Sequence, residues 1–244
     1  MKINYGIKTG FNEAFIIDRA KKDELIAADP KSAEIIRPIL RGRDIKRYTY
    51  EFADLWLIAT HNGIREKGIP PVNVKKYPAI KAHLDQFYAA LEKRFDKGDT
   101  PYNLRSCAYT DDFSKQKIVW GNLCLSAQYT LVGEQYFISA PATMIVPGDR
   151  YLLSVLNSKI ADFYVRSLGV TRNGGYFEYK PMFIEKLPVP KLSEAENMPF
   201  ISCVNQILET KNHQSPTTTE ELRLDNMICD IYGLNEEEKA FLDK

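Results

Sequence analysis

Four short runs rich in β-branched and aromatic residues lie close together near the middle of the chain, and they constrain its fold most. Glycine, asparagine and proline separate these runs, which are Lys117–Trp120, Tyr129–Val132, Tyr136–Ser139 and Thr143–Val146. Runs of this length between turn-forming residues are typical of β-strands. The sequence therefore predicts a meander of strands.

Helical segments are predicted before and after these strands. The clearest has apolar residues at helical spacing after Pro78 and a basic opposite face. Asp29, Asp149 and Asn235 are predicted N-caps, and Pro30 suits a first helical position because it lacks the N–H that would be unpaired there. The predicted segments are Asp18–Ile36, Lys75–Gly98, Arg150–Leu168 with an interruption near Asn157, Pro199–Lys211, Glu220–Tyr232 and Glu236–Leu242.

The two ends of the chain suggest how it is organised. Residues Ile3–Ile17 alternate around two glycines, which predicts a β-hairpin, and this abrupt start favours a piece of a longer polypeptide. Pro181, Pro188 and Pro190 predict an extended exit, because proline cannot continue a helix. We therefore expect an α+β fold: a mixed sheet or meander with flanking helices over residues 1–190, then a small helical segment over 191–244.

Composition excludes several classes of protein. The chain is 44% hydrophobic, which excludes disorder, and 33 Lys and Arg nearly balance 32 Asp and Glu, so any nucleic-acid contact must come from local basic patches. The four cysteines form no CxxC pair and favour a reducing cytoplasm without zinc. No leader sequence or membrane-length apolar stretch is present, so we expect a soluble, cytoplasmic protein with no membrane partner.

Motifs for a complete enzyme are missing. An adenine methyltransferase needs a glycine-rich cofactor loop and an Asn-Pro-Pro-Tyr type of tetrapeptide that holds the flipped base. The one Pro-Pro pair, Pro70–Pro71, follows Ile69 and precedes Val72, so the amide is absent. No Gly-x-Ser-x-Gly elbow exists, and the three histidines lack metal-ligand spacing. We therefore predict no catalytic residue and no metal site.

A cryptic metal nuclease stays open as an alternative. Asp44 and Lys46 form an Asp-x-Lys motif, which is part of what a metal-dependent nuclease requires. Matches of three residues are common in a chain that is 27% charged, and this one lies among arginines after a glycine turn. The structural interpretation of Asp44 is therefore preferred.

Two loops and two basic patches carry the remaining polar chemistry. Residues 61–65 and 171–175 each combine an asparagine, an arginine and glycine, and these amide and guanidinium groups pair with adenine and guanine edges respectively. The patches lie within residues 37–47 and 76–97. Both patches also have structural interpretations, since the first can pair with Asp44 and Glu51 and the second can be the solvated face of a helix.

Several stretches resemble a known family. Residues 6–15, 29–36 and 40–45 are similar, in order, to the TaqI-like C-terminal specificity domains of adenine-specific methyltransferases and fused type IIG restriction enzymes. Residues 151–159 and 181–190 resemble the closing helix and exit strand of those domains and of type I specificity subunits. The ending, 221–238, is similar to the helical tail of type IIG proteins.

The resemblance implies a DNA target-recognition domain over 1–190 and a helical tail over 191–244. Such a module docks on double-stranded DNA and reads bases in the major groove, while a methyltransferase domain of the same polypeptide flips out an adenine for N6 methylation. The resemblance places S-adenosylmethionine in that N-terminal half, assigns no cofactor to this chain, and leaves open whether the parent enzyme also cleaves DNA.

We expect the residues of the loops and patches to divide between two roles. The candidates for base reading are Asn62, Arg65, Arg172 and Asn173. The candidates for phosphate binding are Lys8, Arg41, Arg43, Lys46, Arg47, Lys93, Arg94 and Lys97. The rival from another class is a protein-interaction module that serves assembly without DNA readout.

Overall fold

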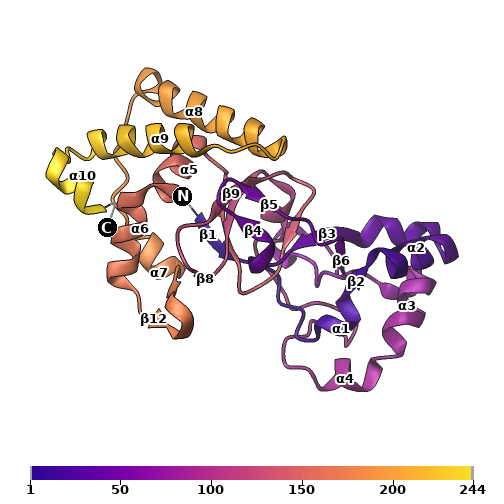
Figure 1. Ribbon diagram of the computed structural model, residues 1–244. Helices are drawn as coiled ribbons and strands as arrows, with labels where there is room; N and C mark the ends of the chain where they lie inside the picture. The colour runs from indigo at the N-terminus through magenta and orange to yellow at the C-terminus, as the bar shows by residue number, and fades with distance from the viewer. Residues whose placement is uncertain (1, 243–244) are drawn as a thin grey trace.

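A central antiparallel sheet divides the molecule into two sides, and the computed structural model describes residues 2–242 (Figure 1). The central sheet has the strand order β1-β11-β7-β9. A second sheet has the order β10-β3-β6-β2, and two small sheets have the orders β12-β13-β8 and β4-β5. The strands are β1 Lys2–Tyr5, β2 Ile16–Asp18, β3 Ile36–Leu40, β4 Ile45–Lys46, β5 Thr49–Tyr50, β6 Leu55–Ile58, β7 Lys117–Trp120, β8 Leu123–Cys124, β9 Tyr129–Val132, β10 Phe137–Ile138, β11 Thr143–Val146, β12 Thr171–Arg172 and β13 Tyr176–Glu178.

The C-terminal helices cover one side of the central sheet, and on its other side the second sheet lies between it and the N-terminal helices (Figure 1). The α-helices are α1 Asn12–Phe15, α2 Arg19–Ala28, α3 Pro78–Asp85, α4 Tyr88–Lys93, α5 Arg150–Asn157, α6 Lys159–Leu168, α7 Pro181–Ile184, α8 Glu194–Asn212, α9 Thr218–Ile231 and α10 Glu236–Leu242. The 3-10 helices are η1 Pro30–Ile35, η2 Gly42–Asp44, η3 Arg65–Lys67, η4 Val74–Lys76, η5 Thr110–Ser114 and η6 Asn173–Gly175. The mixed α+β architecture expected from the sequence is confirmed.

The four predicted β-runs are strands, but they do not form a meander. β7 pairs with β9 and with β11, and both pairings are antiparallel. β10 leaves this sheet and pairs in parallel with β3, so the chain crosses from one sheet to the other and back between β9 and β11. The meander prediction is wrong because β10 pairs outside the run, with β3, and because β11 lies between β1 and β7 and not beside β10.

The central sheet is buried on both faces. Successive residues of a strand point to opposite faces, and here both sets are apolar. Ile118 and Trp120 of β7 face the core beneath α5, α8 and α9, whereas Val119 faces the core shared with the second sheet. In β11, Ile145 faces the core beneath α5, α8 and α9, and Met144 faces the core shared with the second sheet. This explains the nearly continuous apolar composition of both strands.

The N-terminal segment does not form the predicted hairpin. β1 pairs with β11, with Lys2 opposite Val146, whereas β2 pairs with β6 in the second sheet. The hairpin prediction is wrong because the partners of β1 and β2 are distant in sequence. The residues between them instead form a partly buried loop, with Lys8 and Gly10 exposed, and the short helix α1.

The predicted helix over Lys75–Gly98 is two helices. α3 ends at Asp85 and α4 begins at Tyr88, with Phe87 outside helical geometry at φ −108° and ψ 7°. The Phe87 ring packs against the rings of Phe11 and His83, with centroids 5.9 and 5.4 Å away. We attribute the break to this packing, because neither proline nor glycine lies at the junction.

The helical C-terminal part is close to its prediction. Asp149 caps α5 by accepting from Leu152 N, and Ser158 caps α6, so the interruption near Asn157 is confirmed. α8 begins at Glu194, earlier than expected, with a capping box between Ser193 and Glu196, and Pro199 lies in its second turn. Among residues 2–242, no helix combines the length and apolar character needed to cross a membrane.

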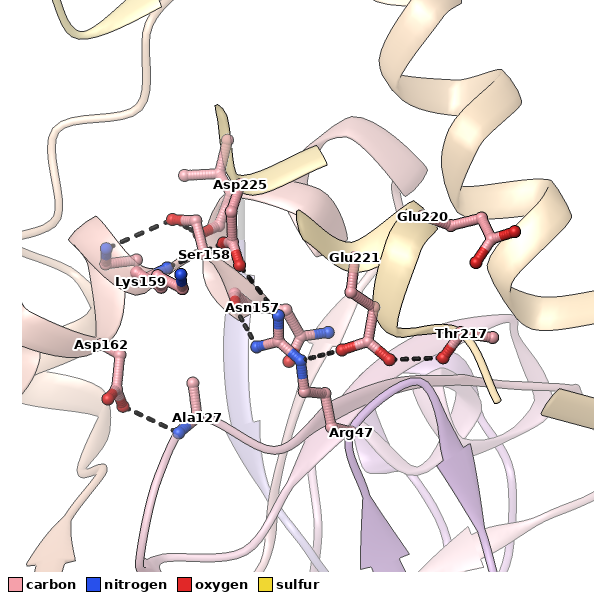
Figure 2. A network of polar contacts seen from close by, with 12 residues as sticks. Arg47, Ala127, Asn157, Ser158, Lys159, Asp162, Thr217, Glu220, Glu221 and Asp225 are labelled. Atoms are coloured by element: carbon pink, nitrogen blue, oxygen red, sulfur yellow. Dashed lines mark hydrogen bonds and ion pairs between the residues drawn. The ribbon is translucent and has the colours of Figure 1, made fainter. Parts of the chain in front are cut away.

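A polar network joins α9 to the rest of the molecule (Figure 2). Arg47, after β4, donates to the Glu221 carboxylate and to the Asn157 carbonyl, and its Nη2 lies 3.6 Å from Asp225 Oδ2. Asp225 also accepts from Lys159 N at 3.0 Å. Apolar residues of α8 and α9, among them Val204 and Ile228, are buried in the same core as the central sheet. The C-terminal helices therefore pack as an integral part of the fold.

Candidate nucleic-acid interface

A β-hairpin projects from the end of α6 and exposes most of its residues. β12 and β13 pair with Thr171 opposite Phe177, and every residue from Thr171 to Tyr176 is exposed. Gly174 and Gly175 turn the chain, each at φ +78°, a conformation that favours glycine. An exposed tip of this kind has little to contribute to the core, so its side chains are available to a partner.

An ion-pair cluster lies at the base of this hairpin. Arg172 Nε donates to Glu178 Oε1 at 2.7 Å, and Arg172 Nη2 donates to the same oxygen. Lys180 Nζ lies 2.6 Å from Glu178 Oε2. Hydrogen bonds from Lys180 and Arg172 lower the pKa of the Glu178 carboxyl. Two cations thus share one carboxylate, which leaves the cluster with a net positive charge.

A groove lies across the side of the molecule that carries the second sheet. Three adjoining hollows of about 640, 330 and 300 Å³ form it. The first two share Tyr5, Ile7 and Lys8, and the last two share residues 106–108, so they are continuous. Its walls come from residues 5–12, 61–66, 96, 104–110 and 140–141.

The 61–66 loop is held in shape by its own polar residues. Gly63 has φ +72°, and an added Cβ would lie 2.3 Å from the Ile69 carbonyl oxygen, so the turn requires glycine. Gly63 N donates to His61 Nδ1, which leaves Nε2 as the protonated nitrogen of a neutral ring. Burial lowers the pKa of His61. Asn62 is 5% exposed and donates to Asp99 and Ser106, so its amide supports the loop.

Three cationic side chains stand at the groove. Arg65 is 89% exposed, and the ion pair that it forms with Asp99 is 3.6 Å long. Arg105 is more than half exposed and reaches Asp96 at 3.0 Å. Lys8 is exposed and lines both larger hollows. Exposed pairs of this kind contribute little energy, so these cations can exchange their partners for phosphate oxygens.

Direct contacts connect the hairpin to the groove. β13 pairs with β8, and Gly121, just before β8, lies against Gly42, where an added Cβ would be 3.1 Å from the Gly42 carbonyl oxygen. Gly42 in turn faces Ala142, next to the groove residues 140–141. Exposed Arg43 follows Gly42 directly. In Figure 1 the β12 end of the molecule and helix α1 extend to the same side, the bottom of the view.

The family described as the TaqI-like C-terminal specificity domain matches residues 37–189, well over half of the sequence. The chain belongs to this family. The matched range of the specificity domain contains the 61–66 loop, Arg43 and the β12–β13 hairpin. No match was found among curated proteins.

Two solved structures share the fold of this specificity domain. The type IIL restriction-modification enzyme MmeI, solved in complex with DNA, matches with a TM-score of 0.77 at 14% identity, covering 99% of this chain and 34% of that chain. The type IIG restriction endonuclease BpuSI matches with a TM-score of 0.52 at 15% identity, covering 93% and 30%. The specificity domain thus spans about a third of the length of either enzyme chain.

The structure gives internal partners to three of the predicted phosphate-binding arginines. Arg41 holds the buried Asp44 carboxylate through Nε and Nη2, at 3.0 and 2.7 Å. Arg47 belongs to the network on α9. Arg94 is 7% exposed, donates to the carbonyls of Thr9 and Asn103, and stacks on Phe15. These side chains stabilise the specificity domain itself.

The other predicted phosphate-binding residues are accessible. Within residues 2–242, Arg43 and Lys93 are exposed and make no ion pair, and the amines of Lys46 and Lys97 donate only to backbone carbonyls. Asn173 is exposed at the hairpin tip. Arg105 and Lys180 were not identified from the sequence, because each is an isolated basic residue outside a patch or a glycine-containing loop.

The Asp-x-Lys motif has a structural role. Asp44 is 5% exposed and accepts from the Arg41 side chain and, at 2.8 Å, from the Arg41 backbone N–H. In the described part of the chain, no three His, Cys, Asp or Glu side chains gather into a group that could hold a metal. The Asp44 carboxylate is therefore engaged in the η2 turn through both of its oxygens.

Proposed function

We propose that this chain reads the target sequence for a restriction-modification adenine-N6 methyltransferase, by docking on double-stranded DNA and contacting bases in the major groove. Membership of the specificity-domain family over residues 37–189 carries the proposal. The exposed hairpin and the cation-lined groove support it, because duplex recognition needs both phosphate anchors and side chains that reach base edges.

The proposed contacts divide between the two surfaces. Arg172 and Asn173 on the hairpin and Arg65 at the groove read bases, because guanidinium and amide groups pair bidentately with guanine and adenine. Lys8, Arg43, Lys46, Lys93, Lys97 and Arg105 bind phosphates. Asn62, Arg41, Arg47 and Arg94 are left out, because their polar groups are satisfied within the fold.

The chain acts, in this proposal, beside a catalytic part of a longer polypeptide. The match covers about a third of the MmeI and BpuSI chains. The methyltransferase domain and its S-adenosylmethionine lie in an N-terminal part, and this chain contributes recognition and no catalytic residue. Any nuclease activity of the parent enzyme lies there as well.

The test is selection of the protein on a randomised duplex library, with the retained DNA sequenced at increasing salt. Enrichment of a short motif is the expected result, together with an affinity that falls steeply with salt, because each neutralised phosphate releases counterions. Retention without a motif would contradict base reading by this chain. Absence of retention at low salt would contradict DNA binding altogether.

Paired variants separate base reading from phosphate anchoring. Arg172→Ala should relax preference at one position of the motif, at a cost of roughly 1–3 kcal/mol on the preferred duplex. Lys93→Ala should weaken binding to all duplexes about equally and leave the motif unchanged. An equal loss on every duplex for Arg172→Ala would reassign Arg172 to phosphate binding.

A protein-interaction module is the second candidate function, and exposed apolar residues favour it. A hollow of about 430 Å³ between α6 and α10 is lined by Phe163, Phe177 and Phe241. Leu125 and Met182 are each more than half exposed. Salt-insensitive association with a protein partner, without DNA retention, would support this function over DNA reading.

A further inference from the structure

The β12–β13 hairpin pairs its exposed arginine with a buried carboxylate, and this pairing fixes which part of the arginine faces outward. We propose that Glu178 is a positioning residue that orients Arg172 to present its terminal N–H edge to a guanine in the major groove. This assignment rests on the proposed function and deepens it, because it names the residue that orients Arg172 and the base that Arg172 reads.

The guanidinium has two usable edges, and Glu178 occupies one of them. A guanidinium carries five N–H donors in one plane. Arg172 directs Nε–H and one N–H of Nη2 at Glu178 Oε1. The other edge consists of one N–H of Nη1 and the second N–H of Nη2. Among residues 2–242, no acceptor bonds to Nη1, so this edge is available to an external partner.

The carboxylate is held firmly enough to act as a template. Glu178 is 5% exposed, whereas the Arg172 side chain is 54% exposed, so the anion is fixed and the cation lies at the surface. β13 pairs with both neighbours, with Glu178 opposite Leu123. The Arg166 guanidinium covers the Phe177 ring at 4.0 Å, which anchors the strand beside Glu178.

Lys180 keeps the cluster attractive to DNA. Glu178 Oε2 pairs with Lys180 at 2.6 Å, so the single negative charge is shared between two cations. Paired with Glu178 alone, Arg172 would be neutralised, and the pair would have no net attraction for a phosphate-lined duplex. With Lys180 present, the cluster keeps a positive charge while both carboxylate oxygens remain engaged, which favours a charged and oriented Arg172.

The chemistry of the free edge selects guanine. Two parallel N–H donors match two adjacent acceptors, and guanine alone offers such a pair, N7 and O6, in the major groove. Adenine offers one acceptor and one donor there, so its amino group opposes an N–H of Arg172. A fixed guanidinium plane makes this mismatch costly, because the side chain cannot rotate to avoid it.

The experiment compares base preference in the wild-type protein and in Arg172→Ala, Glu178→Gln and Asp54→Asn variants. Gln keeps the shape of Glu178 and removes the charge. Asp54→Asn is the matched control, since Asp54 lies between β5 and β6 and accepts from the exposed Arg19 and from the Trp56 indole, both outside the hairpin. Thermal unfolding of each variant verifies that it is folded.

The readout is binding to the selected motif in which one guanine at a time is replaced by adenine or by 7-deazaguanine, which lacks the N7 acceptor. At the position that Arg172→Ala identifies, we expect the wild-type protein and Asp54→Asn to lose roughly tenfold in affinity. Glu178→Gln should show little discrimination there and full discrimination at the other positions, as Arg172→Ala does.

The outcomes separate the two proposals. If wild-type protein selects no motif, the proposed function fails and this assignment with it. If a motif appears and Arg172→Ala leaves every guanine preference intact, the proposal that Arg172 reads a guanine is overturned. If Arg172→Ala loses one preference and Glu178→Gln keeps it, or Glu178→Gln weakens all duplexes equally, the positioning role of Glu178 alone is overturned.

Discussion

Removal of Arg47 should detach the C-terminal helices from the central sheet. In Arg47→Ala, the Glu221 and Asp225 carboxylates, 15% and 9% exposed, lose their guanidinium partner. Loss of one partner of a buried ion pair costs about 3–5 kcal/mol. Glu221 keeps Lys211 at 3.2 Å and Asp225 keeps the N–H of Lys159. We therefore expect the lower part of that range, about 3 kcal/mol.

Urea unfolding followed by circular dichroism measures this cost. At a slope of roughly 2 kcal/mol per molar urea, the midpoint should fall by about 1.5 M. The control is Arg19→Ala, because Arg19 and Asp54 form an exposed pair of 65% and 35% exposure, and such pairs contribute about 1 kcal/mol or less. If both variants lower the midpoint by the same small amount, the network does not hold the tail.

Three further predictions concern the groove and the core. Lys8→Ala and Arg105→Ala should each reduce by about 1 the slope of log affinity against log salt, as measured by DNA titrations at several salt concentrations. Gly63→Ala should lower both melting temperature and DNA affinity, whereas Gly68→Ala, at φ +66° with open space around it, should cost only about 1–2 kcal/mol and spare binding. Burial lowers the pKa of Lys117 to about 8, so the unfolded chain binds more protons between pH 8 and 10.5 and stability should rise across that range. Lys117→Met should remove this rise in pH-dependent urea unfolding, and an unchanged profile would contradict the argument.

Local chemistry made the strands and helix caps predictable. β7, β9 and β11 have the predicted bounds, because β-prone residues between turn formers encode an extended segment locally. Asp149 and Asn235 cap helices as expected, since an N-cap depends on neighbours within three residues. Strand pairing depends on residues far away in sequence. The partner of Lys2 is Val146, which no local pattern near Lys2 could indicate.

The candidate site was predictable in outline and not in its individual contacts. The 171–175 loop is exposed, as its composition indicated, whereas Arg65 is the exposed residue of the 61–65 loop and Asn62, Gly63 and Ile64 are buried. Composition could not show that Asn62 supports its own loop or that Arg94 binds the carbonyls of two other segments. An arginine that satisfies backbone carbonyls and one that awaits a phosphate look alike in a sequence, because the difference lies in what folds around them.

The central sheet, which is buried on both faces, fixes the distance between the hairpin and the groove. Both surfaces of the proposed interface are connected to this sheet. The hairpin is connected through β8 and the Gly121–Gly42 contact, and the groove is connected through β1 and the 140–141 segment. A close-packed sheet between two cores deforms little. The separation between the hairpin and the groove is therefore fixed. If the hairpin and the groove read two parts of one target, insertion of a single base pair between those parts should abolish recognition, even though every contacted base is still present.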